Sequence, residues 1–90
     1  MGTEYKIMVG SNCNGCNCGC GCCVHKITDG IVVKVYCAND AETIDGYRYE
    51  VKKMPDGRCC IVRREVTSVQ IGGVSQKDIY GSEEILMCVP

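Results

Sequence analysis

The chain has no phenylalanine and no tryptophan, and this absence limits the core that it can form. A core must therefore be assembled from Val, Ile, Leu, Met and Tyr. Its 90 residues are near the lower end of the sizes that a single hydrophobic core can stabilise. We therefore expect one domain covering residues 1–90, with a strong need for covalent or metal cross-links.

The chain also lacks a strong charge of either sign and a long apolar run. Its formal net charge is -1, and its longest positive runs are only Lys52-Lys53 and Arg63-Arg64. This composition argues against nucleic acid or an anionic membrane surface as a partner. No segment approaches membrane-spanning length, and the N-terminus does not resemble a secretion signal. The chain as written would be cytoplasmic, whereas a removed signal peptide would make it extracellular, so the compartment is left open.

Catalytic machinery is equally scarce. The chain has a single histidine, His25, and no Ser/His/Asp arrangement accompanies it. No phosphate-binding loop is present, because Gly72-Gly73 has the pattern of a turn. One cysteine with one histidine is too little to predict a nucleophile. We expect no enzymatic activity.

Short segments of alternating polarity, separated by turn residues, run through the chain. Asp29-Gly30 and Pro55-Asp56-Gly57 each have the composition of a hairpin turn. No segment has sustained helical periodicity. The sequence predicts an all-β fold, a small barrel or sandwich of six or seven short antiparallel strands. The strands are expected at residues 5–9, 24–28, 31–37, 47–54, 58–66, 68–71 and 85–89, with a Cys-rich loop at 11–23 between the first two.

What the chain has in abundance is cysteine, ten residues in all. Six of the ten lie within the eleven residues from Cys13 to Cys23, and every spacer between them is Gly or Asn. These are the residues that most readily adopt left-handed backbone conformations. The run offers sulfur and flexibility but little apolar bulk, so sulfur chemistry must explain it.

Soft-metal binding is our leading hypothesis for this loop. Its six thiolates could hold two tetrahedral Zn²⁺ or about four trigonal Cu(I) ions, with shared sulfurs. Over Cys13–Cys23 alone the chain resembles metallothioneins, and this resemblance implies metal storage or delivery. Structural stabilisation is a further possible role, and an iron–sulfur cluster fits the spacing less well. The expected ligands are Cys13, Cys16, Cys18, Cys20, Cys22 and Cys23, with Cys59, Cys60 and His25 in reserve.

A disulfide-stapled extracellular structural or self-assembling module is the alternative. A bond between adjacent Cys22 and Cys23 would be strained, since their Cα atoms are about 3.8 Å apart. The loop would therefore need wider pairs or partners among Cys37, Cys59, Cys60 and Cys88. Self-association through open strand edges or intermolecular disulfides belongs to this alternative. Chemical modification of the thiols is a third hypothesis.

Overall fold

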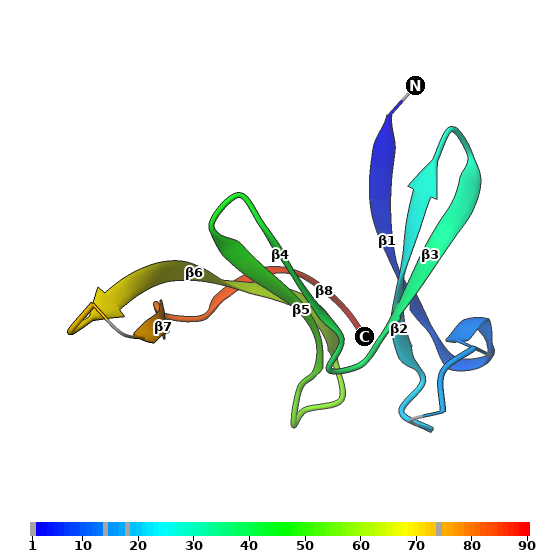
Figure 1. Cartoon of the computed structure of the whole chain (residues 1–90). Helices are drawn as coiled ribbons and strands as arrows, with labels where there is room; N and C mark the ends of the chain where they lie inside the picture. The colour runs from blue at the N-terminus through cyan, green and yellow to red at the C-terminus, as the bar shows by residue number, and fades with distance from the viewer. Residues whose placement is uncertain (1, 14, 18, 74) are drawn as a thin grey trace.

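A computed structural model describes residues 2–13, 15–17, 19–73 and 75–90, with Ile71 and Ser75 described by their backbone alone. These residues form eight strands and one short 3-10 helix, η1 (Gly10–Cys13). The strands make two antiparallel sheets of three and five strands (Figure 1). The predicted all-β class is thus confirmed, with more strands than the six or seven expected.

The three-stranded sheet, sheet A, consists of β1 (Thr3–Val9), β2 (Cys22–Thr28) and β3 (Ile31–Cys37) in that order. The predicted turn at Asp29-Gly30 joins β2 to β3, and both of its residues have a positive φ. The ladder is interrupted between Lys26 and Ile27, where the β2–β3 register shifts. This sheet carries the Cys-rich loop, which runs from η1 to the start of β2.

The five-stranded sheet, sheet B, has β5 (Tyr47–Lys53) and β6 (Cys59–Ile71) at its centre. β4 (Ala41–Ile44) pairs with β5, and β6 extends well beyond β5. On its other edge β6 pairs first with β8 (Glu84–Val89) and further along with β7 (Ser75–Tyr80). The far end of β6 and β7 therefore form a two-stranded arm, which projects at the left of Figure 1.

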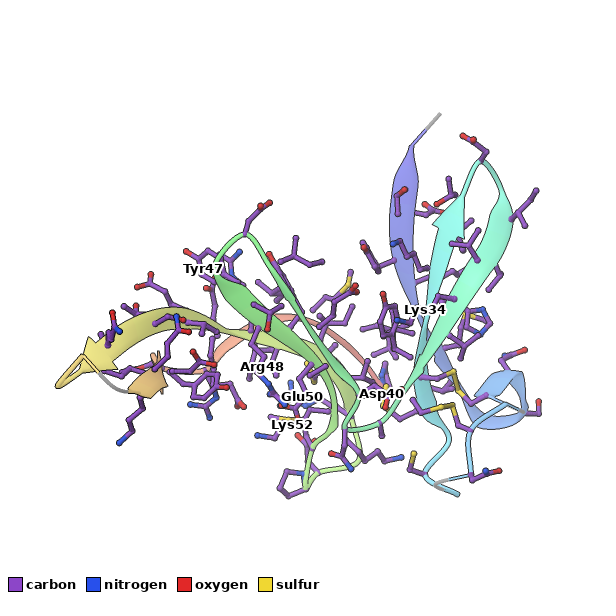
Figure 2. All side chains as sticks on the ribbon, viewed as in Figure 1. Lys34, Asp40, Tyr47, Arg48, Glu50 and Lys52 are labelled. Atoms are coloured by element: carbon purple, nitrogen blue, oxygen red, sulfur yellow. A yellow bond between two sulfur atoms is a disulfide. The ribbon has the colours of Figure 1, made fainter. Side chains whose placement is uncertain are left out.

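The two sheets diverge from a junction near the Cys-rich loop, so the molecule has the outline of a V (Figure 1). The connection from β3 to β4 crosses this junction and is braced by backbone hydrogen bonds. Asn39 N–H donates to the Val51 carbonyl at 2.7 Å, and Val51 N–H donates to the Asp40 carbonyl at 3.1 Å. Figure 2 shows Asp40 at this crossing, where its carboxylate accepts from Cys37 N–H at 2.8 Å.

The core is small and rich in sulfur. Its central cluster combines two cysteines with Val24, Tyr36 and Val51, which meet where the sheets converge. Cysteines make up more than half of the buried apolar residues that the structure describes. The full set is Cys13, Cys22, Cys23, Val24, Tyr36, Val51, Cys59, Cys60 and Val62.

Candidate functional site: the cystine network and the cleft between the sheets

The Cys-rich loop is closed at its base by a backbone contact. Gly10 N–H donates to the Gly21 carbonyl at 3.0 Å, which brings the two ends of the loop together. Gly21 has a φ of 62°, and a Cβ atom there would lie 3.3 Å from the Gly10 nitrogen. A positive φ and this close approach together require glycine at position 21. The glycine spacers thus let the chain turn back toward β2.

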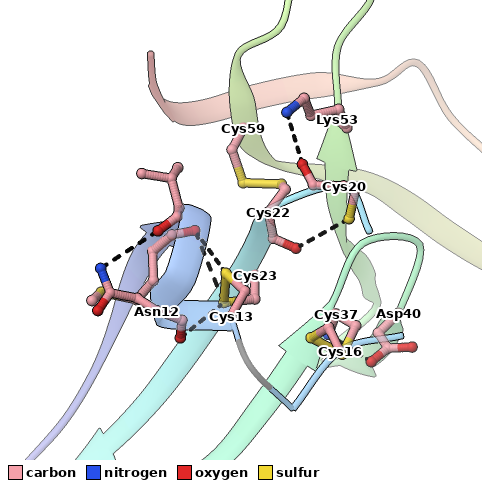
Figure 3. The surroundings of a disulfide bond; sticks show 12 residues. Asn12, Cys13, Cys16, Cys20, Cys22, Cys23, Cys37, Asp40, Lys53 and Cys59 are labelled. Atoms are coloured by element: carbon pink, nitrogen blue, oxygen red, sulfur yellow. Dashed lines mark hydrogen bonds between the residues drawn. A yellow bond between two sulfur atoms is a disulfide. The ribbon is translucent and has the colours of Figure 1, made fainter. Parts of the chain in front are cut away.

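Two disulfides fasten the loop to one face of sheet A (Figure 3). Cys13 in η1 bonds to Cys23 in β2, with their Cα atoms 5.8 Å apart. Cys16 bonds to Cys37 at the end of β3, with a Cα–Cα distance of 5.5 Å. Cys23 and Cys37 are direct partners in the β2–β3 register, so both bonds reach the same end of the sheet. The loop is therefore a cross-linked cover on sheet A.

A third disulfide leaves the opposite face of sheet A and joins it to sheet B. Cys22 bonds to Cys59 at the start of β6, with Cα atoms 5.5 Å apart and both side chains almost fully buried. Beside it, the Lys53 ammonium donates to the Cys20 carbonyl at 2.9 Å (Figure 3). Among the described disulfides, Cys22–Cys59 is the one that crosses between the two sheets. It lies at the vertex of the V.

The fourth disulfide lies within sheet B. Cys60 on β6 and Cys88 on β8 face each other in the strand register, and their Cα atoms are 4.1 Å apart. Successive side chains on a strand point to opposite faces. Cys59 and Cys60 accordingly point apart, because Cys59 reaches sheet A while Cys60 reaches β8. The same alternation separates Cys22 from Cys23.

These bonds decide how the expected metal ligands are used. Among the described cysteines no free thiol remains, and no group of His, Cys, Asp or Glu among the described residues could hold a metal ion. Cys13, Cys16, Cys22, Cys23, Cys59 and Cys60 are all in described disulfides, and Cys20 is disulfide-bonded as well. Cys18 lies outside the described residues. Since a sulfur in a disulfide is no thiolate ligand, the structure favours the disulfide alternative over the thiolate cluster.

The reserve ligands have different partners, since Cys59 reaches the Cys13–Cys23 run through Cys22 while Cys60 is bonded to Cys88 on β8. Cys59 and Cys60 point to opposite faces of sheet B and are bonded to different strands. His25 is half-buried on β2, paired in register with Lys6 and Val35 rather than with a cysteine. Its direct neighbours in the ladder are thus those of an ordinary strand residue.

A second feature, which the sequence did not reveal, is an open cleft of about 550 Å³ between the two sheets. Sheet A contributes Tyr5, Val24 and Tyr36, while sheet B contributes aliphatic residues from β5, β6 and β8. Several of these apolar side chains are strongly exposed, among them Leu86 at 42% and Met87 at 49%. No sequence signal predicts the cleft, because its two walls are far apart in the chain.

A tyrosine–carboxylate pair spans the cleft. The Tyr36 hydroxyl on β3 donates a hydrogen bond to the Glu42 carboxylate on β4. Burial, reinforced by this hydrogen bond and by the negative charge of Glu42, raises the pKa of Tyr36 to about 12. The phenol therefore stays protonated, and a donor, throughout the physiological pH range.

No helix among the described residues is long and apolar enough to cross a membrane. No family model, no curated protein and no solved structure matches the chain. The short resemblance of Cys13–Cys23 to metallothioneins thus gains no support from these comparisons.

Proposed function

We propose that this protein is a disulfide-stapled extracellular structural module without catalytic activity. The observation that carries the proposal is the Cys22–Cys59 bond, which joins the two sheets at the centre of the buried core. The Cys-rich loop then serves as the cover and anchor of this junction. Disulfides of this kind persist in oxidising compartments and are rare in the cytosol, which supports a location outside the cell.

The stabilisation that these disulfides provide supports the same structural role. The described disulfides close chain separations of 10 to 37 residues. In the chain-entropy treatment, each loop of this length stabilises the folded state by about 3–4 kcal/mol, although nested loops are not additive. The net stability of a domain this small is on the order of 5–10 kcal/mol. Reduction should therefore unfold the chain.

Soft-metal binding is the competing proposal, and it applies to the reduced chain. The intact mass of the native protein under non-reducing, metal-free conditions separates the two. Each disulfide lowers the mass of the fully reduced chain by about two daltons. A deficit of about eight daltons or more supports the stapled module. A fully reduced mass that gains bound Cu(I) or Zn²⁺ would instead establish the thiolate cluster.

Self-association is the second part of the proposal, and the partner is another copy of this chain. The radius of gyration is 15.0 Å, against about 12 Å for a compact 90-residue domain. The accessible surface of 5954 Å² exceeds the ~5,200 Å² typical of a monomer of this mass. The excess is close to the ~800 Å² that each partner buries in a standard interface.

The surface best suited to this contact is the open edge of β3. Among the described strands it pairs with β2 alone, and four of its apolar residues are exposed, Ile31 at 66% and Val33 at 55% among them. Its only charged residue is Lys34. Such an edge is a template for pairing with another strand.

A further inference from the structure

The cleft between the sheets is an apolar feature that the function proposed above does not use. It is open to solvent, it measures about 550 Å³, and this volume lies in the range of small-molecule sites. From its lining we propose that it binds a small organic cation, an ammonium or guanidinium group on an apolar body.

The walls supply a surface for the apolar body. Val24 and Val51 form the floor, where the sheets converge, and both belong to the buried core. Ile44, Leu86 and Met87 form the exposed upper walls, at 39%, 42% and 49% exposure. A ligand that covers these side chains removes apolar surface from water, which favours binding.

The charged residues that line the cleft are all acidic, and this determines the sign of the ligand. They are Glu4, Asp40, Glu42 and Glu50, and neither lysine nor arginine is among the described lining residues. Glu50 is paired with Arg48 at 2.8 Å and is already partly neutralised. Glu42 accepts from the Tyr36 hydroxyl, a neutral donor, so its negative charge is retained. An organic cation complements this lining, and an anion is repelled by it.

Aromatic rings give the cation a second attraction. Tyr5, Tyr36 and Tyr49 line the cleft, and the rings of Tyr5 and Tyr36 lie 6.5 Å apart between centroids. The Lys34 ammonium already sits 4.7 Å from the centroid of the Tyr36 ring. This internal contact shows that the Tyr36 ring takes an ammonium group as a cation–π partner. Aromatic rings next to carboxylates are the usual surroundings of organic cations in proteins.

The test compares three probes that share a phenyl body and differ in charge: phenethylammonium, phenethyl alcohol and 3-phenylpropionate. The oxidised protein is titrated with each at low salt, and binding is followed by NMR shifts of the Val24 and Val51 methyl groups. We expect the ammonium probe to bind about tenfold more tightly than the alcohol. We expect the carboxylate probe to be weakest, and added salt to reduce the difference.

Matched variants test whether the acidic residues of the cleft cause the preference for the ammonium probe. Glu4→Gln combined with Glu42→Gln removes two charges from the cleft while keeping the amide oxygen as an acceptor for Tyr36. This variant should lose about tenfold in affinity for the ammonium probe and little for the alcohol. Asp56→Asn combined with Asp78→Asn removes the same charge from residues outside the cleft lining, on a turn and on β7. That control should bind all three probes as the unchanged protein does.

Three outcomes would overturn the proposal: equal binding of ammonium and alcohol, no binding at ~10 mM, or equal losses in both variants. Methyl shifts that depend on protein concentration rather than on probe would assign the cleft to a second copy of the chain instead. The proposal rests on the proposed function only because the Cys22–Cys59 disulfide holds the cleft walls together. An intact mass measured on the same sample separates failure of the staple from failure of the ligand site.

Discussion

Neighbouring cysteines determine the cross-linking of this molecule because adjacent strand residues point to opposite faces. Cys22 and Cys23 connect β2 to sheet B on one side and to the loop on the other. Cys59 and Cys60 connect β6 to sheet A on one side and to β8 on the other. Two dipeptides are thereby sufficient to link both sheets and the loop. Moving one of these cysteines by a single position along its strand would direct its bond to the wrong face.

The backbone of the loop imposes its own requirement at Gly21. Gly21→Ala should lower the free energy of unfolding by about 2 kcal/mol, because the new Cβ would meet Gly10 in a left-handed conformation. Gly19→Ala is the matched control. Gly19 has a similar φ of 64°, but a Cβ atom added there would meet nothing within 4 Å. Gly19→Ala should therefore lower the free energy of unfolding by only about 1 kcal/mol. Urea unfolding of the two oxidised variants would measure both losses. Equal losses would contradict the close approach.

The Tyr36–Glu42 pair predicts a pH dependence at high pH. The pKa of Tyr36 is about 12 in the folded protein and close to 10 in the unfolded chain. The folded state therefore holds the proton more tightly, and the contribution of Tyr36 to stability stays constant below about pH 10 and falls between about pH 10 and 12. Tyr36→Phe should flatten this fall and should cost about 1 kcal/mol at neutral pH through the lost hydrogen bond. Unfolding free energies at pH 8 to 11.5 test the slope, and an unchanged slope in the variant would contradict the assignment.

For the cysteines, the sequence could predict the directions of neighbouring side chains but not their disulfide partners. Peptide geometry predicted that Cys22 and Cys23 are not bonded to each other, and strand alternation alone places Cys59 and Cys60 on opposite faces. The observed disulfides agree with both. The actual partners could not be predicted, because the bond between Cys22 and Cys59 depends on how two separate sheets meet.

At the scale of strands, the two hairpins with strong turn residues were predicted close to their observed positions. β4 and β7 were not predicted. β4 has only four residues, and β7 carries Gln76, Lys77 and Asp78, so neither has a clear apolar alternation. β6 was predicted as two pieces, whereas pairing first with β8 and then with β7 keeps it continuous. Long-range pairing overrode the local pattern at these places.

Removal of single disulfides should distinguish the bond between the sheets from the bond within sheet B. Cys22→Ala with Cys59→Ala should allow the sheets to part, with a loss of about 3–5 kcal/mol and of the NMR contacts between Val24 and Val51. Cys60→Ala with Cys88→Ala removes a bond within sheet B and serves as the matched control. It should cost stability as well but should keep those contacts between the sheets. Loss of the contacts in both variants would contradict the junction at Cys22–Cys59.

The open edge of β3 gives a prediction about assembly. Val33→Lys places a second charge next to Lys34 on this edge and should shift the protein from dimer toward monomer in sedimentation equilibrium. Thr43→Lys adds the same charge to β4, an edge strand of sheet B, and should leave the dimer intact. A monomeric unchanged protein at ~100 µM, or equal effects of the two variants, would contradict self-association through β3.

For the whole molecule, cystine takes the place that large aromatic side chains hold in other small cores. The sequence indicated this need through its lack of Phe and Trp and its excess of cysteine. It could not indicate the V-shaped arrangement or the cleft, because both depend on the angle at which Cys22, Val24 and Tyr36 of sheet A meet Val51 and Cys59 of sheet B. No local pattern encodes that angle.

Tryptic mapping of the native, unreduced protein, digested at mildly acidic pH after thiols are blocked, tests whether Cys22–Cys59 joins the two sheets. Cleavage after Lys and Arg places the cysteines in four peptides, residues 7–26, 35–48, 59–63 and 78–90. The described disulfides connect all four, through Cys16–Cys37, Cys22–Cys59 and Cys60–Cys88. We predict one linked four-peptide species whose fragmentation places Cys22 on Cys59, with no blocked thiol. Release of peptide 59–63 from peptide 7–26, or blocked thiols throughout the Cys13–Cys23 run, would contradict the stapled junction.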